Sequence, residues 1–142
     1  MAAVTTPTLA TTSGTVIRAL GDFEALIRVG GAVSGVDRVH TALHGYMLEI
    51  CNLENIPHTD EADITALFKL IRQHHPKFNT QPSGTEPQKV FRGLAQVVDA
   101  MNPVRNHNSM AHPNEALLEE PEAMLVVNAA RSLLHYLNMK LR

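Results

Sequence analysis

The stretch that decides the fold lies between residues 34 and 53 and reads SGVDRVHTALHGYMLEICNL. Apolar side chains recur in it every three or four residues, which places them on one face of an α-helix. These side chains are Val36, Val39, Leu43, Tyr46 or Met47, Ile50 and Leu53. Ser34 is the predicted N-cap, because a serine hydroxyl can accept a hydrogen bond from an amide of the first turn. We therefore predict a long amphipathic helix here, which ends before Pro57.

Four further stretches show the same spacing of apolar side chains. The helices predicted from them span about residues 13–30, 59 or 60 to 76, 85–101 and 121–137. Thr85 and Gln88 form a capping box at the start of one of them. No stretch alternates with the period of two that is typical of a strand. The sequence therefore predicts an all-α fold, an antiparallel bundle of four or five helices.

Length and composition predict one globular domain. The chain has 142 residues, of which 44% are apolar and 18% charged, and this is not the composition of a disordered protein. Residues 13–142 are predicted to form a single helical domain. Residues 1–12 are rich in Ala and Thr and lack periodicity, so we predict a flexible N-terminal lead-in.

Charge and cysteine content limit the partners and the compartment. The formal net charge is −2, so a global positive field that attracts nucleic acid is excluded, and any RNA contact must be local. Cys51 is the single cysteine, which excludes an intramolecular disulfide and suits a cytoplasmic protein. We find no run of 18 apolar residues and expect no membrane contact.

The polar stretch RNHNSMAH, residues 105–112, interrupts the apolar pattern and contains the candidate catalytic residues. Arg105 offers a permanent planar cation that suits phosphate, and His112 can take or give a proton near neutral pH. Seven residues apart on a helix, the two would return to nearly the same face. Together they could cleave a phosphodiester without a metal or other cofactor, with Asn106 orienting the imidazole or the phosphate.

The residues alone leave other interpretations open. An Arg and a His in a polar loop commonly cap helices or pair with carboxylates, here those of Glu119, Glu120 and Glu122. His40 and His44 are four residues apart and could clamp a metal, which would make the chain a metal-binding bundle. We expect no native metal site, because no third ligand lies nearby in sequence.

Several segments together resemble the abortive-infection C-terminal domain family of the HEPN superfamily, over roughly residues 36–137. The polar stretch matches the R-x(4–6)-H motif of that superfamily. The segments are VDRVH (36–40), LFKL (67–70), RNHNSMAHPN (105–114), Glu122-Ala123 and NAARSLL (128–134).

The resemblance implies a helical bundle that acts as a metal-independent endoribonuclease in antiviral defence, or as a toxin. It implies Arg105, Asn106 and His112 as the catalytic set, RNA as the substrate, and a homodimer whose two Arg/His pairs share one cleft. It also implies a sensing region, or a separate sensor or antitoxin subunit, as a partner. The alternative is a non-catalytic dimerising module that binds RNA or a partner protein.

Four further polar residues are candidates for substrate binding. His107 and Asn108 lie inside the polar stretch, next to the candidate catalytic set. Lys89 and Arg92 lie on the predicted helix 85–101 and could guide RNA phosphates if that helix borders the cleft.

Overall fold

The computed structural model describes residues 4–9, 14–78, 86–100 and 119–141. These residues form α-helices and connecting segments, and no strand occurs among them, which confirms the predicted all-α class. The five helices are α1 (Gly14–Gly30), α2 (Ala32–Leu53), α3 (Ile64–His74), α4 (Glu86–Ala100) and α5 (Glu120–Lys140).

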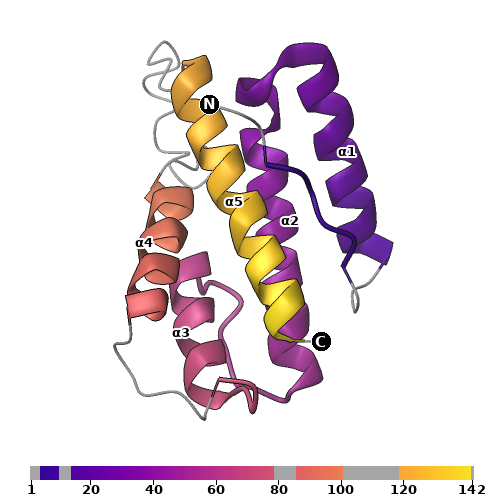
Figure 1. Cartoon of the computed structure of the whole chain (residues 1–142). Helices are drawn as coiled ribbons and strands as arrows, with labels where there is room; N and C mark the ends of the chain where they lie inside the picture. Colours follow the sequence, from indigo (N-terminus) through magenta and orange to yellow (C-terminus); the bar gives the residue numbers. More distant parts are fainter. Residues whose placement is uncertain (1–3, 10–13, 79–85, 101–118, 142) are drawn as a thin grey trace.

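Helix α2 lies at the centre of the bundle (Figure 1). It contacts α1, α3 and α5, while α4 contacts α3 and α5. Helices α2, α3, α4 and α5 therefore enclose a four-helix core, and α1 packs on the outside against α2. Gly35 allows this close approach of α1, because a Cβ at this position would lie 2.7 Å from the side chain of Ile27.

Most helices that follow one another in the chain run antiparallel. Helices α2 and α5, which also contact each other, do not. The first turns of α2 and α5 lie together, since the Ala32 amide donates to the Glu120 carboxylate. Their last turns also meet, around a small cavity that Ile50 and Asn138 help to line. Helices α2 and α5 therefore run in the same direction, while α4 runs opposite to α5 (Figure 1).

The apolar stripe that predicted α2 is buried almost throughout. Only the last predicted member, Leu53, is exposed. Opposite it, α5 is buried over six consecutive residues, from 126 to 131. A helix buried on every side needs cover from several elements, and α2, α4 and the N-terminal segment supply it for α5.

The start of α2 differs from the prediction of a Ser34 N-cap. The helix begins at Ala32, after Gly31, whose φ of 81° reverses the chain in a single residue. The Glu120 carboxylate accepts from the amides of Ala32 and Val33, at 3.0 and 3.5 Å. Ser34 lies in the first turn and donates to the Gly30 carbonyl. The cap thus comes from a distant helix, which a local pattern cannot reveal.

Helix α3 begins later than the sequence predicted, at Ile64 rather than near residue 59 or 60. Asp63 is its N-cap, and its carboxylate accepts from the Ala66 amide at 2.8 Å. The preceding residues instead form a connection that is anchored by buried Ile56. Asn55 turns this connection with a φ of 54°, a left-handed conformation that asparagine tolerates better than most residues.

The N-terminal segment Val4–Leu9 lies along α5 and is hydrogen-bonded to it, a contact that the prediction of a flexible lead-in did not include. Val4, at the start of the segment, pairs with Asn128, and Thr8, near its end, pairs with Asn138, so the segment runs parallel to the helix. The bonds are Val4 amide to Asn128, His135 to the Thr5 carbonyl, Arg131 to the Thr6 hydroxyl, and Asn138 to the Thr8 carbonyl.

Among the residues that the structure describes, none of the helices combines the length and apolar character that crossing a membrane requires.

Candidate functional site

The sequence-predicted catalytic residues Arg105, Asn106 and His112 lie outside the described residues, as do His107 and Asn108. Their segment follows α4 and precedes α5 in the chain. The described structure therefore reports on the two helix ends that border this segment.

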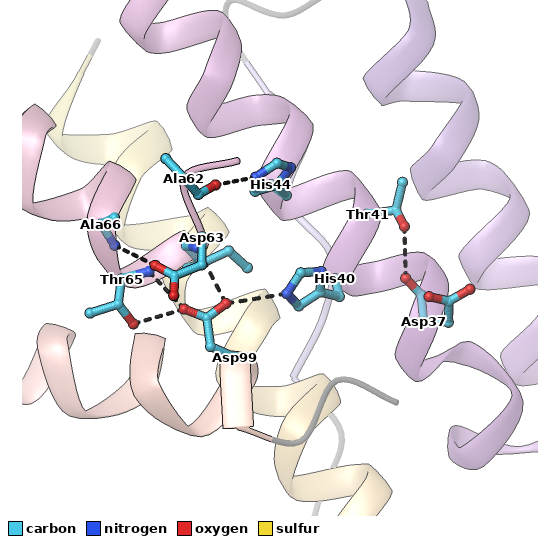
Figure 2. Close-up of polar contacts among 10 residues, drawn as sticks. Asp37, His40, Thr41, His44, Ala62, Asp63, Thr65, Ala66 and Asp99 are labelled. Atoms are coloured by element: carbon cyan, nitrogen blue, oxygen red, sulfur yellow. Dashed lines mark hydrogen bonds and ion pairs between the residues drawn. The ribbon is translucent and has the colours of Figure 1, made fainter. Parts of the chain in front are cut away.

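The end of α4 carries a polar cluster that joins three helices (Figure 2). We call His40, Thr65 and Asp99, with the amides of Ile64 and Thr65, the Asp99 cluster. Nε2 of His40 lies 3.3 Å from one oxygen of Asp99. The amide and the hydroxyl of Thr65 each donate to the other oxygen at 2.8 Å. The side chains of His40 and Asp99 are only 5% and 14% exposed, so these bonds are shielded from water.

The hydrogen bonds keep the Asp99 carboxylate ionised. Burial raises the pKa of this carboxyl group, but the hydrogen bonds from His40, Thr65 and Ile64 together outweigh burial and hold the pKa below its usual value. The charged carboxylate lies at the N-terminus of α3, where amides point outward and the helix dipole favours a negative charge. Asp99 thus acts as a second cap for α3, beside Asp63.

The histidine pair on α2 is used for contacts within the protein. His40 and His44 stack, with ring centroids 6.2 Å apart. Nε2 of His40 donates to Asp99, and Nε2 of His44 donates to the Ala62 carbonyl at 2.7 Å. Within the described ranges, no group of three or more His, Cys, Asp or Glu side chains could hold a metal ion. The metal-binding interpretation of this pair therefore gains no support from the described geometry.

The two cations predicted to bind substrate, Lys89 and Arg92, have different surroundings. Lys89 is exposed on the first turns of α4 and pairs with Glu86 at 3.2 Å. Arg92 lines a groove between α3 and α4, together with Lys69 and Arg72 of α3. The structure thus brings Arg92 next to two cations that the sequence analysis did not single out.

Asp99 and Thr65 are also residues that the sequence reasoning missed. Asp99 did leave a signal, because it is an acidic residue that follows the apolar Val97 and Val98 in the last turn of a helix. Carboxylates are unfavourable near a helix C-terminus unless another group stabilises them. Thr65 gave no comparable signal, since its role depends on a partner 34 residues away.

A comparison with protein families matches residues 15–140 of the chain to the Abi_C model, described as a HEPN-like domain. The chain belongs to this family. The match covers most of the sequence and includes the segment with Arg105 and His112, so the resemblance noted from the motifs is confirmed at the level of the family. No curated protein and no solved structure matches this HEPN-like domain.

Proposed function

We propose that this HEPN-like domain is a metal-independent endoribonuclease that acts in abortive-infection or toxin–antitoxin defence. One observation carries the proposal. A chain that belongs to the Abi_C family has an arginine and a histidine at the R-x6-H spacing, Arg105 and His112, in the segment between α4 and α5.

The chemistry assigns a distinct role to each residue. His112 takes the proton of a ribose 2′-hydroxyl, whose oxygen then attacks the adjacent phosphorus, and the bond to the 5′-oxygen breaks. Arg105 stabilises the negative charge that builds on the phosphoryl oxygens. Asn106 orients the imidazole or the phosphate. The products are a 2′,3′-cyclic phosphate and a 5′-hydroxyl.

A homodimer completes this mechanism. One imidazole cannot serve as base and acid in the same step, whereas two copies related by a twofold axis supply both, together with two cations. We propose that RNA binds where the two Arg105/His112 pairs meet, with His107, Asn108, Lys89 and Arg92 as further contacts. A sensor or antitoxin subunit is the proposed regulatory partner.

The described helix ends support the proposal by providing a fixed frame. Asp99 ties the last turn of α4 to α2 and α3, and Glu120 ties the first turn of α5 to α2. The segment with the motif therefore begins and ends next to turns that are held to the same central helix.

Cleavage of a labelled single-stranded RNA by the purified chain tests the proposal. We expect cleavage in the presence of EDTA, a cyclic phosphate product, and loss of at least about 100-fold in rate for His112→Ala and for Arg105→Ala. His74→Ala is the matched control, because His74 is an exposed histidine at the end of α3. Circular dichroism and light scattering verify fold and dimer for each variant.

The same variants should abolish growth arrest when the chain is expressed in cells. Full cleavage by a folded His112→Ala or Arg105→Ala variant would reject the site. A stable wild-type complex with RNA or with a partner protein, without cleavage, would favour the non-catalytic module instead.

A further inference from the structure

The groove between α3 and α4 gathers positive charge in a chain that is negative as a whole. It has a volume of about 460 Å³ and is open to solvent. Lys69 and Arg72 are three residues apart on α3 and so share one face, and Arg92 lies on the α4 side. Three of the twelve Lys and Arg residues thus line a single groove.

The described lining of the groove holds fewer acidic than basic side chains. Among the described lining residues, Asp63 carries the one carboxylate, and this carboxylate caps α3 through the Ala66 amide. The described lining residues thus include three cations and one carboxylate, whereas the whole chain has a net charge of −2. Lys69 and Arg92 are exposed, so their charged groups are accessible to a ligand in the groove.

The groove is continuous with the Asp99 cluster. Thr65 lines the groove and also donates two hydrogen bonds to Asp99. Asp99 lies seven residues after Arg92 on α4, which is about 10 Å along the helix axis. The groove therefore reaches from Arg92 toward the C-terminal end of α4, where Asp99 lies.

We infer that this groove, which we call the α3–α4 groove, binds the phosphodiester backbone of the single-stranded RNA substrate. The inference rests on the proposed function and adds a second binding site for the RNA strand, outside the Arg105–His112 segment. Arginine forks pair with phosphate oxygens, and lysine adds a point charge, without regard to the base.

The walls of the groove also indicate how selective the binding is. Among the described residues that line the groove, Phe68 is the one aromatic residue, and at 2% exposed it offers no ring face on which a base could stack. Binding in the α3–α4 groove should therefore be electrostatic, strongly dependent on salt and indifferent to sequence.

The test measures binding separately from cleavage. The full chain with His112→Ala serves as the background, and fluorescence anisotropy follows a labelled uridine oligonucleotide over a series of salt concentrations. The test variant adds Lys69→Gln and Arg92→Gln, two exposed residues whose replacement should leave the fold intact. The control adds Arg18→Gln and Arg38→Gln, two exposed arginines that do not line the groove.

We expect the test variant to bind about tenfold more weakly at low salt, and the slope of log K against log salt to fall by about 1.4, or 0.7 for each lost contact. The control, with the same loss of charge, should stay within about twofold of the background. Equal weakening in both variants, or none in the test variant, would overturn the inference. Displacement of the RNA by polyglutamate at lower charge concentration than by polyuridine would also overturn it, in favour of an acidic protein segment.

The outcome is distinguishable from failure of the proposed function. If the wild-type chain cleaves RNA but the test variant binds it normally, the α3–α4 groove assignment is wrong and the nuclease proposal stands. If the groove variants lose RNA binding but the wild-type chain never cleaves, the nuclease proposal fails and the groove assignment stands.

Discussion

Two buried polar clusters lie on opposite sides of the central helices. In both, hydrogen bonds to one carboxylate join three parts of the chain, but the parts that are joined differ. The Asp99 cluster joins α2, α3 and α4. A second one, the Arg131 cluster, consists of Thr6, Glu24 and Arg131 and joins the N-terminal segment, α1 and α5. Each is built around one ionised carboxylate, but the main partner of Glu24 is a permanent cation, while that of Asp99 is a helix N-terminus with an imidazole.

The difference shows what each cluster can do. Arg131 is 5% exposed, its guanidinium lies 2.6 Å from Glu24 and 4.8 Å from the centroid of the Phe23 ring, and it donates to Thr6. The Arg131 cluster therefore fixes an otherwise aperiodic segment to the domain. The Asp99 cluster fixes the turn that precedes the predicted catalytic segment. The Arg131 cluster thus joins the N-terminal segment to the helices, whereas the Asp99 cluster holds the helix end from which the proposed catalytic segment continues in the chain.

Replacement of Arg131 should give the largest loss of stability. Arg131→Met keeps much of the aliphatic packing but leaves Glu24 and Thr6 without their partner. Because Glu24 is partly exposed, we expect a loss of about 2–4 kcal/mol rather than the full cost of an isolated buried charge. Urea unfolding followed by circular dichroism measures it.

A second measurement, hydrogen exchange, reports on the N-terminal segment alone. The Val4 amide donates to Asn128, one turn from Arg131, so its hydrogen exchange should accelerate in Arg131→Met. Arg28→Met is the control, since it removes a second, exposed cation near Glu24 that bonds to the main chain of this residue rather than to its carboxylate. Arg28 donates a long hydrogen bond of 3.5 Å to the Glu24 carbonyl, and its charge is the last and smallest cause that lowers the pKa of Glu24. An unchanged Val4 exchange rate would mean that Arg131 does not hold the segment.

Replacement of Asp99 should cost less stability but more activity. Asp99→Asn keeps the shape and one acceptor oxygen, so we expect a loss of about 1–3 kcal/mol. Under the proposed function, RNA cleavage should fall in kcat while RNA binding stays near wild type, because Asp99 is bonded to α2 and α3 and holds the end of α4 from which the segment with Arg105 and His112 follows in the chain. Arg131→Met, although less stable, should keep kcat at temperatures where it is folded. Equal kcat losses in the two variants would remove the functional distinction between the clusters.

The sequence could predict local structure, but it could not predict contacts between residues that are far apart in the chain. The α2 stripe was predictable because helix periodicity is local, and burial of Val36 to Ile50 follows from it. The cap on α2 comes from Glu120, 88 residues after Ala32. The side chain that accepts the hydrogen bond from the Val4 amide lies 124 residues after Val4. No local pattern encodes such pairs, which is why the start of α2 and the docked N-terminal segment were missed. The Arg105–His112 site stays a prediction.

Acid should weaken both clusters in the same direction. The pKa of Glu24 is lowered overall, since burial raises it but the hydrogen bonds from Thr6 and Arg131 and the charge of Arg131 outweigh burial. The pKa of Asp99 is likewise lowered. A folded-state pKa below the unfolded value means that the stability is present above the unfolded values of 4.5 and 3.8 and is lost as pH falls through the folded values.

Variants identify each contribution to this acid transition. Asp99→Asn and Glu24→Gln should each flatten the fall in unfolding free energy below about pH 5, and the double variant should flatten it further. Urea titrations at half-unit pH steps measure the slopes. A single variant whose acid slope equals that of the wild type would show that its carboxylate has the same pKa in both states.

The smallest effect concerns His75, which belongs to neither cluster. Burial lowers its pKa, Glu54 raises it and Lys77 lowers it again, with a net decrease from the usual 6.5. Its Nδ1 accepts from the Lys77 amide at 3.0 Å, which requires the neutral ring. The unfolded chain therefore binds more protons as pH falls below 6.5, and stability decreases there. His75→Gln should abolish this part of the slope, whereas His74→Gln, at an exposed histidine, should leave it unchanged. This pH range lies above the range in which Glu24 and Asp99 titrate. The loss of stability due to the His75 imidazole can therefore be measured apart from the acid transition of the two clusters.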